Sequence, residues 1–246
     1  LQAPGVDEAI RAKLAAADVA MLPRLLEIVA RRRIVAALPD VLAALKSSDR
    51  AVREAALAAL GETVDLDRLH LLVERAIGSD DAGDSPAALV ALRAACVRMP
   101  DRDACTAKLE PAVTTAPLGT RIAMLDIVGQ IGGARALAVV AAAAGGDQEP
   151  LQDAGTRLLG KWQTPDAAAV LLDLTTSLPS GKYRERALKG YLRIARQFAA
   201  NEAERVAMCR KAVAAARDDD DRRIVFDAIA AMPNAAALRK AVEATP

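Results

Sequence analysis

Aromatic residues are scarce in this sequence, and their scarcity narrows the fold class. The 246 residues include one tryptophan, two tyrosines and two phenylalanines, and no segment sustains the two-residue alternation of a half-buried strand. Alanine, by contrast, makes up about a quarter of the chain. Because alanine has the highest helix propensity and lets neighbouring helices approach closely, the composition predicts an all-α protein built from many thin helices.

An excess of charge of one sign is also lacking. The 33 basic residues are balanced by 32 acidic ones, whereas proteins that bind nucleic acid usually carry a strongly basic face. The longest apolar run, 136–144, is mostly alanine and falls short of the roughly 18 residues that a membrane-spanning helix needs. We therefore predict no nucleic-acid partner and no membrane span.

Metal-ligating and catalytic side chains are few. His70 is the single histidine, so no imidazole pair exists for a zinc or iron site. The acidic residues Asp80, Asp81 and Asp84 lack the spacing of a calcium loop, and those at 218–221 precede a helix whose N-terminus they complement. We expect no metal, no cofactor and no catalytic residues, and hence a protein that is not an enzyme.

Three cysteines raise the question of a disulfide bond. Cys96 lies near the end of one predicted helix and Cys105 near the start of its antiparallel partner, with Pro100 in the turn between them. Their Cα atoms could therefore fall within disulfide range, and a bridge would form if the chain reaches an oxidising compartment. The alternative is two small buried hydrophobic residues. Cys209 has no neighbour in sequence to pair with.

One segment, 49–61, displays the unit from which the chain is built. Val52, Ala56 and Leu60 follow the apolar stripe of an amphipathic helix, with Leu57 beside them. Asp49 is placed to cap the N-terminus of this helix, and Gly61 is placed to end it. A second helix follows and completes a hairpin.

The same plan recurs along the chain, in segments 120–129 and 151–160 and in looser copies. We predict a single solenoid over residues 1–246, with an N-terminal cap helix at 6–17 and about seven helical hairpins. The hairpins lie near 19–46, 49–77, 84–115, 117–144, 149–178, 181–216 and 218–244. Pro39 and Pro111 fall inside predicted helices, which they should kink.

Segment 49–61 resembles the signature of the HEAT repeat, in which aspartate and arginine form a polar ladder between successive repeats. The resemblance implies a right-handed α–α superhelix of the HEAT or armadillo-like kind. The ladder arginine, Arg53, recurs as Arg121, Arg184 and Arg223, whereas Gln152 replaces it in the fifth unit. Segment 187–195 also resembles HEAT regions of bacterial exported multidomain proteins. This favours an exported or periplasmic location over a cytoplasmic one, although the compartment stays open.

In HEAT-like stacks the second helix of each pair lines the concave face, and here that row carries mixed charge. We predict a monomeric scaffold that binds another protein along this face, a use that favours specificity. The candidate partner-binding residues are Asp67, Arg68, His70, Glu74, Arg75 and Lys108. The identity of the partner stays open.

Several alternative functions remain. The chain could be a spacer or docking region of a larger exported multidomain enzyme. It could also be a HEAT-like lyase that attaches bilin pigments, or a nucleic-acid-binding enzyme, although few aromatic residues are available to line a pocket. The basic run 31–33 ends a predicted helix, where cations are favourable, or else contacts a phosphate or an acidic partner.

Overall fold

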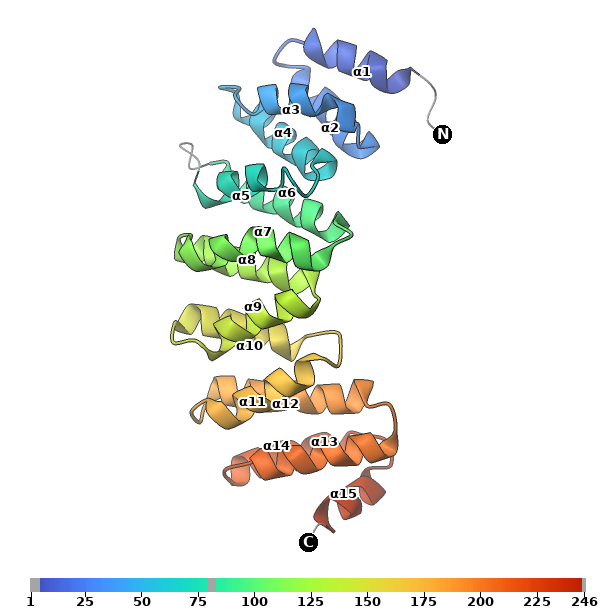
Figure 1. Ribbon diagram of the computed structural model, residues 1–246, viewed down its shortest axis with the longest axis vertical. Helices are drawn as coiled ribbons and strands as arrows, with labels where there is room; N and C mark the ends of the chain where they lie inside the picture. The colour runs from blue at the N-terminus through green and yellow to red at the C-terminus, as the bar shows by residue number, and fades with distance from the viewer. Residues whose placement is uncertain (1–4, 79–82, 245–246) are drawn as a thin grey trace. The chain divides into compact units, whose positions relative to one another are not determined.

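The computed structural model describes residues 5–78 and 83–244, which form fifteen α-helices and one short 3₁₀ helix and contain no strand (Figure 1). The chain divides after Ala136 into two compact units, residues 1–136 and 137–246. The predicted all-α, HEAT-like fold class is confirmed. The single solenoid over the whole length stays a prediction.

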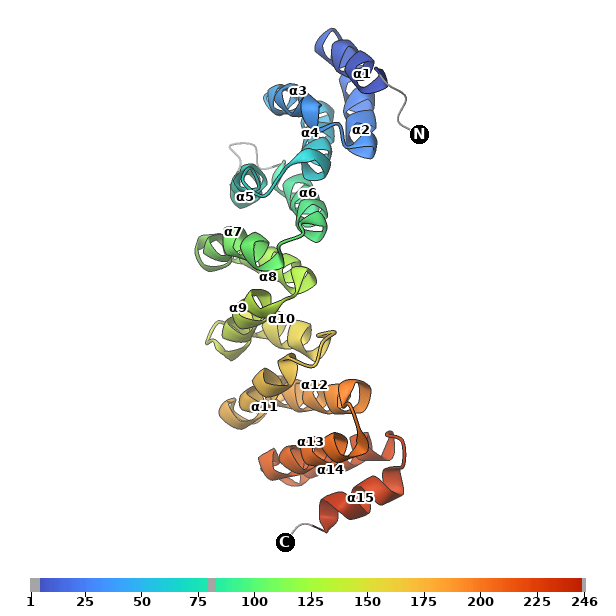
Figure 2. The ribbon, with the colours of Figure 1, turned by 45° about the vertical axis from the view of Figure 1, so that its right-hand side comes forward.

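The first unit holds the cap helix and the first helix pairs. Its elements are α1 (Val6–Ala15), α2 (Leu22–Arg32), η1 (Val35–Ala37), α3 (Leu38–Ala44), α4 (Arg50–Thr63), α5 (His70–Ile77), α6 (Ser85–Arg98), α7 (Arg102–Thr115) and α8 (Leu118–Ile131). The helices α2, α4 and α6 contact one another in succession along one side of this unit, and α3, α5 and α7 follow the other side (Figure 2). This arrangement places the first helices of successive pairs in one row.

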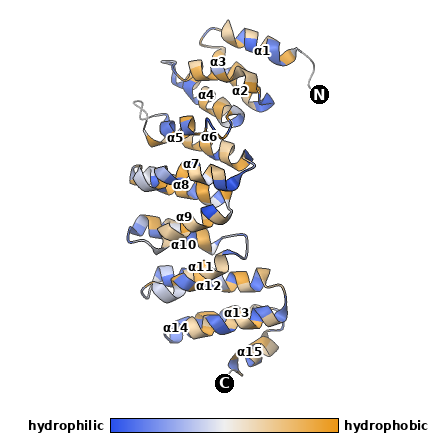
Figure 3. Ribbon diagram, in the orientation of Figure 1, coloured by the Kyte–Doolittle hydropathy of each residue, from blue (hydrophilic) through white to orange (hydrophobic). Residues whose placement is uncertain are grey.

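The second unit continues the same plan. The division between the units falls inside α9 (Ala134–Gly145), and the later helices are α10 (Glu149–Gly160), α11 (Ala167–Ser177), α12 (Lys182–Phe198), α13 (Glu202–Ala215), α14 (Asp219–Ala230) and α15 (Ala235–Glu243). Here α10, α12 and α14 contact one another in order, and α11, α13 and α15 do the same. Each helix carries alternating short blocks of apolar and polar residues (Figure 3).

Two predicted local features are wrong for a physical reason. Pro39 does not kink a helix, because the segment before it forms η1 and Pro39 falls in the first turn of α3, where a missing N–H costs nothing. Gly61 does not end α4, which continues to Thr63. A Cβ at Gly61 would lie 2.7 Å from the carbonyl oxygen of Ala91, so this glycine lets the backbones of α4 and α6 touch. Pro111 lies inside α7, as predicted.

An arginine on the first helix of a helix pair can donate hydrogen bonds to carbonyl groups at the end of the first helix of the preceding pair. Arg98 of α6 donates to the carbonyls of Gly61 and Val64, at 3.0 and 3.1 Å. Arg193 of α12 donates in the same way to the carbonyls of Gly160 and Trp162, at the end of α10. Since the last carbonyls of a helix have no partner within it, these arginines act as caps supplied by the next pair.

Candidate functional site

A groove crosses the row of first helices α2, α4 and α6 in the first unit. Its volume is about 690 Å³. Its apolar floor and walls are formed by Ala30, Ala58, Ala87, Val90, Ala91 and Ala94, and its rim by Arg31, Arg32, Arg33, Glu54 and Glu62. Val90 is 69% exposed although it is apolar, and we call this feature the α2–α4–α6 groove.

The groove exists because small side chains occupy positions where larger ones would fill the space. Gly61 and Ala91 bring α4 and α6 into backbone contact. On the surface above that contact, Ala58, Ala87 and Ala94 present only methyl groups. The sequence did contain a signal for the groove. Alanines occupy an exposed helix face that ordinarily carries long polar side chains. The sequence analysis missed the groove because it placed the binding face on the second helix of each pair, whereas the groove lies on the first helices.

The rim of the groove carries ion pairs. Arg31 pairs with Glu27 at 2.5 Å, Arg32 with Asp7 at 2.7 Å and Arg33 with Glu62 at 2.9 Å. These pairs are largely solvent-exposed, and exposed pairs contribute at most about 1 kcal/mol each. An acidic ligand could therefore exchange with a protein carboxylate at little cost. Arg33 itself caps α2 in the left-handed conformation, with φ of 53°.

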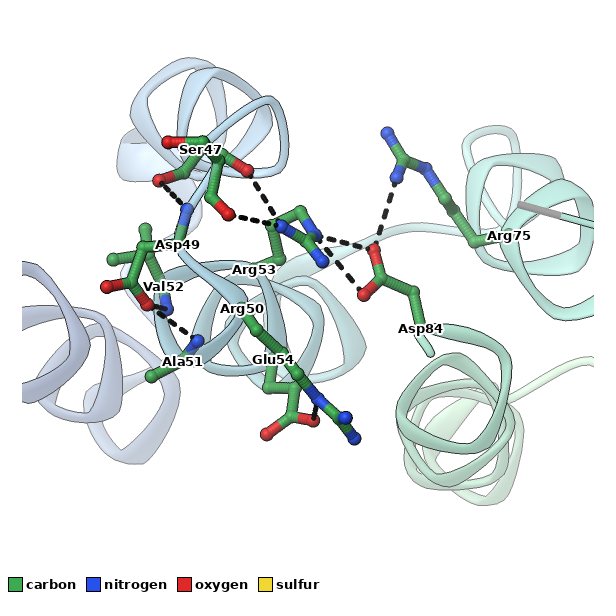
Figure 4. Close-up of polar contacts among 10 residues, drawn as sticks. Ser47, Asp49, Arg50, Ala51, Val52, Arg53, Glu54, Arg75 and Asp84 are labelled. Carbon is green, nitrogen blue, oxygen red and sulfur yellow. Dashed lines mark hydrogen bonds and ion pairs between the residues drawn. The ribbon is translucent and has the colours of Figure 1, made fainter. Parts of the chain in front are cut away.

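A buried arginine supports the helices that form the groove (Figure 4). Arg53 of α4 donates to both carboxylate oxygens of Asp84, at 3.2 and 3.0 Å, and to the carbonyls of Ser47 and Ser48. Asp84 is fully buried, and Arg75 lies 3.6 Å from it. The carboxylate therefore ties α4 to the start of α6 and to α5. Asp49 caps its own helix by accepting from Ala51 and Val52 N–H, as predicted.

The ladder of arginines is only partly continued. Arg184 is buried and pairs with Asp221, and Arg121 donates to the carbonyl of Val113. Arg223 was predicted to extend the ladder, which is wrong: it is exposed and pairs with Asp220 of its own helix at 3.0 Å. Asp221 occupies the buried position instead, because Arg184 reaches it from the preceding pair.

The predicted partner-binding residues are placed by α5, the turn before it and α7. Five of them are exposed: Asp67, Arg68, His70, Glu74 and Lys108. Arg68 pairs with Asp65 at 2.5 Å, and His70 Nδ1 lies 2.9 Å from the carbonyl oxygen of Asp67. Arg75 differs, since its neighbour is the buried Asp84. A role of these residues in binding stays a prediction.

The two thiols of the third hairpin lie together, free and buried. Cys96 lies in the last turn of α6, Cys105 lies in the first turn of α7, and a side-chain hydrogen bond joins them. This bond raises the pKa of Cys96 and lowers that of Cys105, because it stabilises a thiolate at Cys105. Cys209 is also free and buried, and its burial raises its pKa to about 11.

The disulfide between Cys96 and Cys105 stays a prediction, and counting the free thiols of the protein tests it directly. If the bridge forms in an oxidising compartment, unfolded and unreduced protein from that compartment should present one reactive thiol, from Cys209. Thiol titration in denaturant counts them. The Cys209→Ser variant serves as control and should then present none. Three thiols in the unaltered chain would contradict the bridge.

Over the described ranges 5–78 and 83–244, no group of three histidine, cysteine, aspartate or glutamate side chains could hold a metal ion. Asp84 is engaged with Arg53, and the predicted cluster members Asp80 and Asp81 lie outside the described residues. Within the same ranges, no helix is both long and apolar enough to cross a bilayer.

Comparison with known proteins finds no family model and no curated protein that matches the chain. Several solved structures are similar, and two of them are described here. Human deoxyhypusine hydroxylase in complex with glycerol is 17% identical over 99% of this chain and 86% of that one, with a TM-score of 0.38. The complex of CpcE and CpcF of phycocyanin lyase from a Nostoc species is 18% identical over 95% of this chain and 96% of that one, with a TM-score of 0.44. Both are HEAT-like helical solenoid proteins.

These findings correct the predicted function. The sequence was interpreted as a binding scaffold, or a spacer in a larger protein, that is not an enzyme. The two structures named above are those of enzymes, a hydroxylase and a lyase, and the interpretation as a scaffold that is not an enzyme is therefore withdrawn. The identities are too low to transfer any residue role to this chain. The specific resemblance to HEAT regions of exported bacterial proteins stays a prediction.

Proposed function

We propose that this chain is a HEAT-like enzyme of the lyase type, which binds an elongated and mainly apolar molecule with acidic groups in the α2–α4–α6 groove. It acts on that molecule together with a partner protein. The observation that carries the proposal is the groove itself, which combines an apolar floor with a rim of three arginines. Its volume of about 690 Å³ lies within the range of small-molecule sites.

The floor accounts for the apolar part of the ligand. Val90 is exposed on α6, and an exposed valine gains by losing contact with water, at about 25 cal/mol per Å² of apolar surface. Alanines 58, 87 and 94 let a flat molecule lie close to the helices. A lining without aromatic rings holds its ligand through shape and apolar contact instead of stacking.

The rim accounts for the acidic groups. Guanidinium groups bind carboxylates through two parallel hydrogen bonds, and Arg31, Arg32 and Arg33 are among the residues that line the groove. Their present carboxylate partners are on the protein surface, so replacement by a ligand carboxylate exchanges one weak pair for another. Apolar contact with the floor would then supply the net affinity.

The side chains in the groove also indicate which part of the reaction this chain would perform and which part it would leave to the partner protein. The lining has carboxylates and guanidinium groups, and it has no thiol, hydroxyl or imidazole. The chain would therefore bind and orient the ligand, and the partner protein would contribute the attacking group. Glu54 and Glu62 are the groups at the groove that can accept or return a proton.

Binding of a linear tetrapyrrole tests the proposal. Biliverdin is the probe, because it is elongated, mainly apolar and carries two carboxylates, and its absorbance changes on binding. Val90→Asp places a carboxylate in the apolar floor and should weaken binding about tenfold or more. The matched control is Val97→Asp, an equally exposed position on α6 that does not line the groove. Circular dichroism checks that both variants fold.

Two results would contradict the proposal. One is the absence of saturable biliverdin binding by the unaltered chain. The other is an equal loss of binding in Val90→Asp and Val97→Asp, which would mean that the probe sticks to exposed apolar residues in general.

The compartment and the assembly state are part of the same proposal. We propose that the chain is exported or periplasmic and that it is monomeric until it meets its partner protein. Fractionation of the source cells tests the first statement. Sedimentation equilibrium of the purified chain tests the second.

A further inference from the structure

A second groove lies in the other unit, between α12 and α14, and most of its charged side chains are basic. Its volume is about 390 Å³. Leu192 and Met232 form its buried apolar base. The charged side chains that line it are Lys189, Arg193, Arg196, Arg223 and Asp227. Four cations therefore face one carboxylate.

The spacing of these basic residues along α12, and the packing of α14 against α12, bring their side chains together. Positions 189, 193 and 196 are separated by four and three residues, which places them on one face of α12. Arg223 comes from the first turns of α14, which packs against α12. The cations thus line the groove from both helices.

Arg193 is held in place without being neutralised. Its Nε donates to the carbonyl of Gly160 at 2.9 Å, and its remaining nitrogens donate to the carbonyl of Trp162 and to Gln197 Oε1. All three acceptors are uncharged, so the positive charge of the guanidinium group is oriented but not compensated. A site built on such a group loses little side-chain entropy when an anion binds.

The other cations are also poorly compensated. Among the described residues, Arg196 forms no ion pair, and the pairs of Lys189 with Glu185 and of Arg223 with Asp220 are exposed and weak. Burial and the nearby charge of Arg196 lower the pKa of Arg193. Like charges on one helix face repel one another, and an anion placed between them removes that repulsion.

We propose that the α12–α14 groove binds a small molecule with two or more linked phosphate groups. Guanidinium groups match phosphate oxygens in geometry, and two arginines and a lysine on α12 can each contact a different oxygen. The groove volume suits a diphosphate or triphosphate group and not a long polymer. This site lies in the second unit, and the proposal does not depend on the lyase function.

Calorimetric titration with inorganic tripolyphosphate at low salt tests the site. Arg196→Gln removes the unpaired cation from an exposed position, and it should weaken binding about tenfold. Asp227→Asn removes the one carboxylate in the lining and should tighten binding roughly threefold. The matched control is Arg222→Gln, which removes an exposed arginine of α14 that does not line the groove.

The pattern across the variants decides the outcome. Weaker binding by Arg196→Gln, tighter binding by Asp227→Asn and no change in Arg222→Gln would support the site. No saturable binding of tripolyphosphate by the unaltered chain would overturn it. An equal loss in Arg196→Gln and Arg222→Gln would also overturn it, because the affinity would then follow net charge. Tighter binding of single-stranded DNA than of tripolyphosphate would overturn it in favour of a nucleic-acid surface.

Discussion

Replacing Asp221 by alanine is expected to lower the free energy of unfolding by about 3–5 kcal/mol, because it strands a buried charge. Arg184 is 1% exposed, and its other hydrogen bonds go to the carbonyls of Thr175 and Ala215, which leave its charge uncompensated. Urea unfolding followed by circular dichroism measures the loss. The control is Asp219→Ala, an exposed aspartate of the same helix turn, which should change stability by less than about 0.5 kcal/mol.

A double variant distinguishes loss of the pair from loss of packing. Arg184→Met with Asp221→Ala removes both charges, so it should recover part of the stability that Asp221→Ala loses. If the double variant is as unstable as the sum of the two single ones, the two side chains are not energetically coupled, and the ion pair is not the source of the effect.

The same carboxylate gives stability a dependence on acid. Burial acts to raise the pKa of Asp221, but hydrogen bonds from the Arg184 side chain and from the backbone N–H groups of Arg217 and Asp218 outweigh it, and the pKa is lowered. A lowered pKa in the folded state means that the stabilisation is complete above the unfolded value of about 3.9 and is lost as pH falls further. In Asp221→Ala this part of the acid sensitivity should disappear.

Gly61→Ala is expected to lower the free energy of unfolding by about 1–3 kcal/mol, although alanine is the better helix former. The added Cβ would lie 2.7 Å from the carbonyl oxygen and 2.9 Å from the Cα of Ala91, so α4 and α6 must move apart. Thermal unfolding compares this variant with Gly119→Ala. Gly119 also lies in a helix, but nothing stands within 4 Å of its added Cβ, so stability there should stay constant or rise.

A Gly61→Ala protein as stable as the unaltered chain would mean that the two helices are not held in backbone contact. The same variant also reports on the α2–α4–α6 groove, since that contact lies beneath the alanines of the groove. Its affinity for biliverdin should therefore change even where the protein stays folded.

The helices were predictable from sequence because their signals are local. Asp49 caps a helix through N–H groups two and three residues away, and an alanine-rich stripe needs only its own turns to be recognised. The long-range pairings were not predictable. Asp84 lies 31 residues from Arg53, and which carboxylate that arginine reaches depends on how the pairs stack.

The candidate site was missed for a related reason. A groove arises where side chains of three separate helices fail to fill a space, and no single helix contains that information. Gly61 illustrates the limit, since a glycine near a helix end predicts a stop, whereas its neighbour in space makes it a contact point. Ala58 and Ala94 give the matching signal only once α4 and α6 are known to be neighbours.

The caps supplied by Arg98 and Arg193 bear on how such a chain can be recombined. Each arginine belongs to one helix pair, and the carbonyls that it satisfies belong to the pair before. If a single hairpin were moved into another protein, the carbonyls at the end of its first helix would lose the arginine that caps them. Its own arginine would lose the carbonyls that it caps. The exchangeable segment is therefore offset from the hairpin: it runs from the interior of one pair to the interior of the next, so that cap and helix end travel together.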